Sequence, residues 1–171
     1  MISFNILLIE DNPNDVLLVR EALRHRESRV HIETATTLTK GMELLETHHY
    51  DVILLDLLLP DSKVSTILSP LITILSNHPG EYPSIVVLTT IDDRHIKLEA
   101  LHMGAQGYFC KKLLEPDSDV LWVCLEDAYM RGLYIRSLLH SELPNGPIPL
   151  KSVMDAEKVI DSIIERGSNA R

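Results

Sequence analysis

The chain has 171 residues, of which 45% are hydrophobic and 24% are charged, so it can bury the core of one ordinary globular domain. Its 16 Lys and Arg residues against 25 Asp and Glu residues give a formal net charge of -9, which disfavours a nucleic acid partner and favours a small cation as ligand. Every apolar run falls short of the roughly 20 residues that a membrane span needs, so we expect a cytoplasmic protein without membrane contact. The two cysteines, Cys110 and Cys124, lie in apolar or helical patterns and are predicted to be reduced core residues.

Five short apolar runs, each followed by polar or turn-forming residues, predict five buried β-strands. They cover residues 6–9, 30–33, 53–55, 85–88 and 107–110. Patterns with helical spacing follow them at residues 16–23, 38–45, 64–75, 93–102 and about 117–139. Because parallel neighbours need crossover connections, this alternation predicts a doubly wound α/β fold, in which a five-stranded parallel sheet carries helices on both faces.

Two of these helices have identifiable boundary signals. The helix over residues 93–102 has Asp92 before it as a candidate N-cap. Gly104 follows that helix as a stop, because glycine tolerates the left-handed conformation of a helix end. The helix over residues 64–75 precedes the segment HPGEYP at residues 78–83, which should break it.

Acidic, hydroxyl and basic side chains follow the predicted strands, at the sheet edge where ligands bind in such folds. They are Glu10, Asp11, Asp56, Thr89, Thr90, Lys111 and Lys112. Three carboxylates in one pocket repel one another unless a hard cation neutralises them, and an oxygen-rich set of ligands suits Mg²⁺. We therefore predict that Glu10 and Asp11 hold Mg²⁺. Beside that ion and a lysine ammonium, the Asp56 carboxylate can act as a nucleophile toward a phosphoryl group.

Four motifs carry these residues, apart from Lys112: ILLIEDNPND from residue 6, VILLDLLLPD from residue 52, VVLTT from residue 86 and GAQGYFCK from residue 104. In their order and spacing they resemble the receiver domains of two-component response regulators over about residues 4–139. The resemblance implies the flavodoxin-like strand order 2-1-3-4-5, which places strands one and three side by side. It also implies that Asp56 is the phosphoacceptor, with a sensor histidine kinase or a phosphotransfer protein as the donor of the phosphoryl group.

The same resemblance assigns the other residues of the site. Glu10 and Asp11 match the acidic pair that holds Mg²⁺ together with Asp56, and Leu58 matches the residue that adds a main-chain carbonyl to the metal. Lys111 matches the lysine of the site. Thr89 matches the switch hydroxyl and Tyr108 the aromatic switch. Phosphorylation would then change the contacts with a downstream protein partner, through the face formed by the fourth helix, the fifth strand and the fifth helix.

Two departures from the family pattern leave an alternative open. Val64 stands where a glycine is usual, and Lys112 stands where a proline is frequent. A receiver fold that serves as a phosphorylation-independent interaction module is therefore the alternative. An aspartate-based phosphatase usually has a second acid where Leu58 stands, and a flavodoxin-like carrier needs a phosphate-binding loop where Glu10 and Asp11 stand. We accordingly expect a phosphoacceptor and not an enzyme with a further substrate.

Residues 140–171 lie outside the resemblance, so we divide the chain into a receiver domain at residues 1–139 and a C-terminal part. The segment ELPNGPIP at residues 142–149 is typical of a linker. Residues 153–166 predict a helix with Val153, Ala156, Ile160 and Ile163 along one seam. This helix could pack on its own domain, associate with a second copy to form a homodimer, or belong to a longer protein.

Overall fold

The computed structural model describes residues 3–62, 66–77 and 83–141. In chain order, the elements are β1 (Phe4–Ile9), α1 (Pro13–Ala22), the 3-10 helix η1 (Arg24–Arg29), β2 (Val30–Ala35), α2 (Leu38–Thr47), β3 (Val52–Leu55), α3 (Ser69–Asn77), β4 (Ser84–Thr89), α4 (Arg94–His102), β5 (Gly107–Cys110), the 3-10 helix η2 (Lys111–Leu113) and α5 (Asp119–Ser141). The five strands form one all-parallel sheet in the order β2-β1-β3-β4-β5, which confirms the predicted fold class and strand order. Within this part of the chain, none of the helices is long and apolar enough to cross a membrane.

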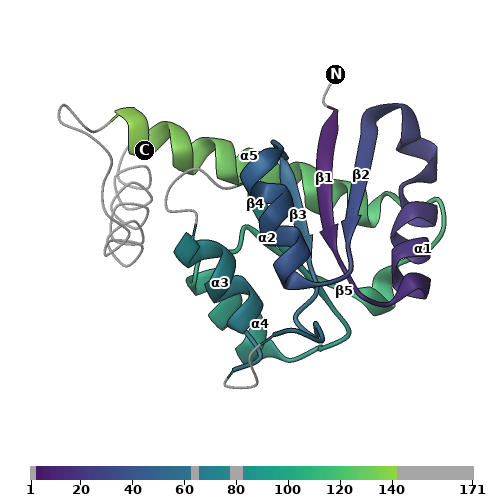
Figure 1. Ribbon diagram of the computed structural model, residues 1–171. Coiled ribbons are helices and arrows are strands. Elements are labelled where there is room, and N and C mark those ends of the chain that lie inside the picture. The colour runs from purple at the N-terminus through teal and green to yellow at the C-terminus, as the bar shows by residue number, and fades with distance from the viewer. Residues whose placement is uncertain (1–2, 63–65, 78–82, 142–171) are drawn as a thin grey trace.

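Helices cover both faces of the sheet, as Figure 1 shows. On one face, side chains of α1 and α5 such as Val19 and Leu125 pack against alternate strand residues, including Leu8 and Leu54. On the other face, α2, α3 and α4 pack against the residues between them, such as Leu7. Because β1, β3 and β4 are covered on both faces, their side chains are almost all apolar and fully buried, as expected for central parallel strands.

Most of the predicted boundaries lie close to the observed ones, but four helix starts differ. Helix α1 begins at Pro13 and not at residue 16. The N-cap of α4 is Asp93, whose carboxylate accepts hydrogen bonds from the backbone N–H groups of His95 and Ile96, and not Asp92. Helix α3 begins at Ser69, so residues 66–68 of the predicted helix are not helical. Helix α5 begins at Asp119, two residues after the predicted start at about residue 117. Asp117 has a φ of 56°, a left-handed conformation that a right-handed helix excludes. Gly104 has a φ of 117° just after α4, as predicted for a helix stop.

The predicted C-terminal linker and helix, and Val64 in the β3–α3 loop, lie outside the described residues. The division of the chain at residue 139 therefore stays a prediction.

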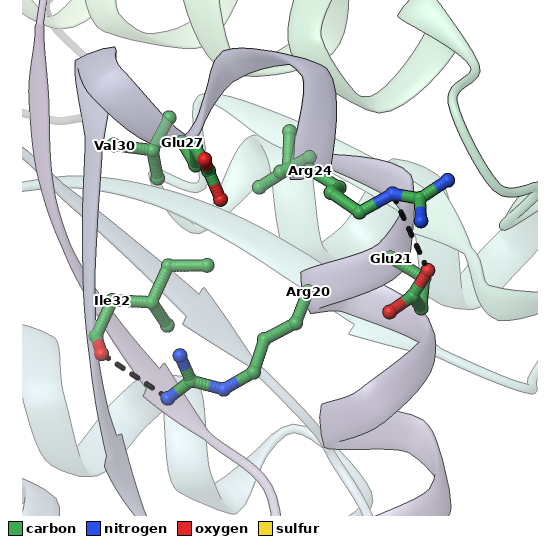
Figure 2. A pocket seen from close by; sticks show the side chains of 7 residues that line it. Arg20, Glu21, Arg24, Glu27, Val30 and Ile32 are labelled. Carbon is green, nitrogen blue, oxygen red and sulfur yellow. Dashed lines mark hydrogen bonds and ion pairs between the residues drawn. The ribbon is translucent and has the colours of Figure 1, made fainter.

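Strand β2 is an edge of the sheet, and the side chain of Arg20 from α1 covers part of it. The Arg20 guanidinium donates to the carbonyl of Ile32 at 3.2 Å and to the Thr34 hydroxyl at 3.2 Å. Next to it lies a cavity of about 270 Å³ (Figure 2), lined by Arg20, Glu21, Leu23, Arg24, Glu27, Val30 and Ile32. Charged side chains over an edge strand hinder its pairing with another chain, so this arrangement protects the sheet.

Candidate functional site

Backbone hydrogen bonds place the predicted site residues at the carboxyl edge of the sheet. The N–H of Glu10 donates to the carbonyl of Ala35 at 2.9 Å, and the N–H of Asp56 donates to the carbonyl of Ile9 at 3.0 Å. These bonds continue the pairing of β1 with β2 and of β3 with β1 by one residue beyond each strand. Both side chains are buried, with residue exposures of 0% for Glu10 and 4% for Asp56.

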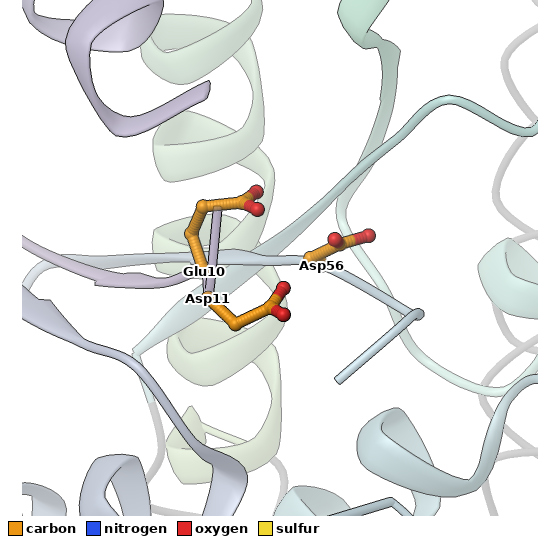
Figure 3. A group of neighbouring side chains, drawn as sticks. All are labelled: Glu10, Asp11 and Asp56. Atoms are coloured by element: carbon orange, nitrogen blue, oxygen red, sulfur yellow. The ribbon is translucent and has the colours of Figure 1, made fainter. Parts of the chain in front are cut away.

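Glu10, Asp11 and Asp56 form a group of carboxylates that could hold a metal ion. One oxygen from each residue lies within 4.8 Å of the others, and Figure 3 shows the three carboxylates gathered on one side of the strand ends. Glu10 and Asp56 are buried whereas Asp11 is exposed, so a bound ion could keep part of its water shell. Three oxygen donors around one point, with room for water, match the coordination that Mg²⁺ prefers.

The ammonium of Lys111 lies at the centre of the buried carboxylates. Its Nζ atom is 2.6 Å from Oε2 of Glu10, 2.9 Å from Oδ2 of Asp56 and 2.9 Å from Oδ2 of Asp15. The Lys111 side chain is 6% exposed, so these ion pairs are largely shielded from water. The ammonium donates hydrogen bonds to Asp15 and Asp56, whereas its contact with Glu10 is an ion pair, and within the described residues Oε2 of Glu10 accepts no hydrogen bond.

Burial and charge shift the pKa values of this group in ways that can be separated. Burial raises the pKa of Glu10 above its ordinary value, and the neighbouring Asp56 charge adds to this increase, whereas the close contact with the Lys111 ammonium opposes it. Burial alone would lower the pKa of Lys111. Its contacts with Glu10, Asp15 and Asp56 outweigh burial and raise the pKa of the ammonium, so Lys111 stays charged at neutral pH.

Thr89 and Tyr108 are linked through the main chain of Ile91. Thr89 ends β4 and is fully buried, and its Oγ1 accepts a hydrogen bond from the N–H of Ile91 at 3.3 Å. Tyr108 lies on the neighbouring strand β5, and its hydroxyl donates to the carbonyl of Ile91 at 2.7 Å. Burial raises the pKa of Tyr108, so the phenol keeps its proton and remains a donor. Sequence analysis singled out Thr89 and Tyr108 but not the main-chain groups of Ile91 that join them.

The loop after β3 turns back on the Asp56 carboxylate. The N–H of Leu58 donates to Oδ1 of Asp56 at 3.2 Å, and the Leu58 side chain is 51% exposed. The role of the Leu58 carbonyl as a metal ligand stays a prediction. Thr90 and Lys112, which follow Thr89 and Lys111 in the chain, are both exposed.

Two acids that sequence analysis did not single out hold the site together. Asp15, in the first turn of α1, binds Lys111 as described above. Asp61 joins the β3–α3 loop to α2, because its carboxylate accepts the N–H groups of Leu38 and Thr39, each at 2.8 Å, and the Thr39 hydroxyl at 2.7 Å. Although burial acts in the opposite direction, these hydrogen bonds lower the pKa of Asp61 below its ordinary value. Both acids stood in the motifs quoted above, but their partners come from distant elements.

Comparisons with known proteins agree with this arrangement. The family described as response regulator receiver domain matches residues 6–122. A protein-glutamate methylesterase/protein-glutamine glutaminase from Paramagnetospirillum magneticum is 35% identical over 109 residues, which cover 60% of this chain but only 28% of that relative.

Solved structures show the same fold. A CheY-like receiver domain protein from Methanospirillum hungatei has a TM-score of 0.61 at 18% identity, covering 79% of this chain and 99% of its own. NtrX from Brucella abortus has a TM-score of 0.65 at 20% identity, covering 80% of this chain but 30% of its own. With its carboxylate group and buried lysine at the carboxyl edge of a 2-1-3-4-5 sheet, the chain belongs to the response regulator receiver domain family of two-component signalling.

Proposed function

We propose that this chain is a phosphorylation-dependent receiver, in which Asp56 accepts a phosphoryl group from a phosphohistidine of a sensor kinase or a phosphotransfer protein. The proposal rests on the position of Asp56, whose carboxylate lies beside those of Glu10 and Asp11 and is bound by the buried ammonium of Lys111. Its carboxylate is held by Lys111 on one oxygen and by the N–H of Leu58 on the other. In this proposal the protein is a cytoplasmic phosphoacceptor and not an enzyme with a further substrate.

The chemistry is a transfer of the phosphoryl group between two nucleophiles. An oxygen of Asp56 attacks phosphorus, the P–N bond to the imidazole breaks, and the imidazole nitrogen keeps the electron pair and takes up a proton. Lys111 offers positive charge to the transferring oxygens from a site with little water, where such charge is most effective. When bound, Mg²⁺ would neutralise the same oxygens, and the carboxylates of Glu10, Asp11 and Asp56 and the carbonyl of Leu58 would hold it.

The signal leaves the site through Thr89 and Tyr108. A phosphoryl group on Asp56 would draw the Thr89 hydroxyl toward itself, away from its hydrogen bond with the N–H of Ile91. Because the Tyr108 hydroxyl is bound to the carbonyl of Ile91, the tyrosine would respond to the same movement. Phosphorylation would thereby favour one member of a pre-existing equilibrium and change the contacts of α4, β5 and α5 with a protein partner or a second copy of the chain.

Incubation with Mg²⁺ and acetyl phosphate, followed by intact mass measurement, tests the proposal. We expect the parent protein to gain one phosphoryl group, and the Asp56→Asn variant to gain none. Asp51→Asn is a matched control, because Asp51 lies at the opposite end of β3 and, within the described residues, its carboxylate accepts only the backbone N–H of Asn5, at 2.8 Å. An adduct that persists in Asp56→Asn would reject Asp56 as the acceptor. A parent protein that gains no phosphoryl group would favour the phosphorylation-independent interaction module.

A further inference from the structure

Asp15 is the third carboxylate on Lys111, and the proposed transfer does not yet give it a role. It lies in the first turn of α1, which Asn12 caps by accepting a hydrogen bond from the N–H of Asn14 at 3.0 Å. Its Oδ2 is 2.9 Å from Nζ of Lys111, and its side chain is 18% exposed. A surface acid in a first helical turn needs no such partner, because the helix dipole already favours it there.

The contact with Asp15 restricts how the Lys111 ammonium can be oriented. Lys111 donates one hydrogen bond to Asp15 and one to Oδ2 of Asp56, and its Nζ atom also lies 2.6 Å from Oε2 of Glu10 as an ion pair. Fixing one N–H of a tetrahedral group on Asp15, with Nζ held beside Glu10, restricts the directions of the other N–H groups. Glu10 follows β1 and Asp15 lies in α1, so neither belongs to the strand that leads to Asp56.

We propose that Asp15 is a positioning residue for phosphoryl transfer, which holds the Lys111 ammonium so that one N–H faces the Asp56 carboxylate. The inference rests on the proposed function. Without Asp15, Glu10 and Asp56 are the remaining carboxylate partners of the ammonium, and it can turn away from the oxygens that receive the phosphoryl group. Because the orientation of a catalytic group strongly affects the reaction rate, loss of Asp15 should slow phosphoryl transfer by on the order of tenfold or more.

The charge of Asp15 and its hydrogen bond to Lys111 should have opposite effects on the rate of phosphoryl transfer. Its negative charge repels an incoming phosphoryl group, so removing only the charge should not slow the reaction. Asp15→Asn keeps an oxygen that can accept from Lys111 and removes the charge, whereas Asp15→Ala removes both. The positioning role therefore predicts adduct formation at or above the parental rate in Asp15→Asn and a rate at least tenfold lower in Asp15→Ala.

The experiment measures initial rates of adduct formation with acetyl phosphate at saturating Mg²⁺, in the parent and in both Asp15 variants. The same two substitutions are made in a Lys111→Met background, where a residue that acts through Lys111 should have no further effect. Asn14→Ala, in the same exposed turn of α1, controls for damage to the helix start. Thermal unfolding of each variant without metal shows that the compared proteins are folded.

The outcomes separate this inference from the proposed function. If the parent gains a phosphoryl group but Asp15→Ala reacts at the parental rate, or loses the same factor in the Lys111→Met background, the positioning role is rejected while the proposed function stands. If Asp15→Asn is as slow as Asp15→Ala, the carboxylate acts by charge and the positioning role is likewise rejected. A parent that gains no phosphoryl group overturns both, since there is then no transfer for Asp15 to assist.

Discussion

Lys111 is a buried cation whose three ion-pair partners all belong to the candidate site. In the absence of a metal, its single positive charge is shared by Glu10, Asp15 and Asp56, and two of these acids are almost fully buried. Desolvated carboxylates without a cation are costly, so the ammonium contributes to the stability of the metal-free protein as well as to the proposed chemistry. The same charge competes with a metal ion for the carboxylates.

This double role predicts opposite effects of Lys111→Met on stability and on metal binding. Without metal, the substitution should lower the free energy of unfolding by about 3 kcal/mol, the magnitude for removing one partner of a buried ion pair. Mg²⁺ should bind more tightly to the variant, because a competing cation is gone. Urea unfolding with and without Mg²⁺ measures both effects.

Lys112→Met is the control, because Lys112 is the next residue in the chain and is exposed. It should match the parent in both measurements. An unchanged metal-free stability of Lys111→Met, or equal losses from the two substitutions, would contradict the role given to Lys111.

Among the elements, the β3–α3 loop is held by α2 through Asp61. The loop carries Leu58, whose N–H binds Asp56, and a turn in which the N–H of Ser62 donates to the Leu59 carbonyl. Asp61 accepts three hydrogen bonds from the first turn of α2, and Thr37 caps the same helix by accepting from the N–H of Lys40. The loop that follows Asp56 is thus fixed to α2, which packs against β1 and β2.

We predict that Asp61→Ala lowers the free energy of unfolding at neutral pH by about 1–2 kcal/mol, as is usual when a helix loses its capping acid. The pKa of Asp61 is lower in the folded protein than its ordinary value of 3.8, so its stabilisation is complete above that value and is lost as the pH falls through the folded pKa. The stability gap between parent and variant should therefore close in acid. Urea unfolding from about pH 7 to about pH 3 measures it. A gap of equal size at every pH would exclude the carboxylate as its cause.

The strands could be predicted from the sequence better than the helix starts, for physical reasons. Strands such as β3 are fully buried and leave uninterrupted apolar runs. The start of α4 depends on which of two adjacent acids, Asp92 or Asp93, turns its carboxylate to the helix, and composition does not distinguish them. Likewise, strand ends indicated Asp56 and Lys111, whereas the contact of Asp15 with Lys111 joins residues far apart in the chain and leaves no local pattern in the sequence.

At the scale of the whole molecule, β5 connects the site to both hydrophobic cores. Lys111 follows the strand directly. Within it, Phe109 packs in the core beneath α1 and α5, and Tyr108 packs against the core beneath α2, α3 and α4. A change in the contacts of Lys111 or of the peptide groups at Ile91 can therefore reach α4 and α5, which lie on opposite faces of the sheet (Figure 1).

In the proposed switch, occupancy of Asp56 changes the structure away from Asp56. The most direct test compares two-dimensional amide NMR spectra of the protein with Mg²⁺ alone and with Mg²⁺ and beryllofluoride, an analogue of the phosphoryl group. We predict shifts at Asp56 and Lys111 together with shifts at Ile91, Tyr108 and along α4, and no such changes in Asp56→Asn. Shifts confined to the strand ends, or none at all, would contradict the switch and leave a fold that binds its partner in one state.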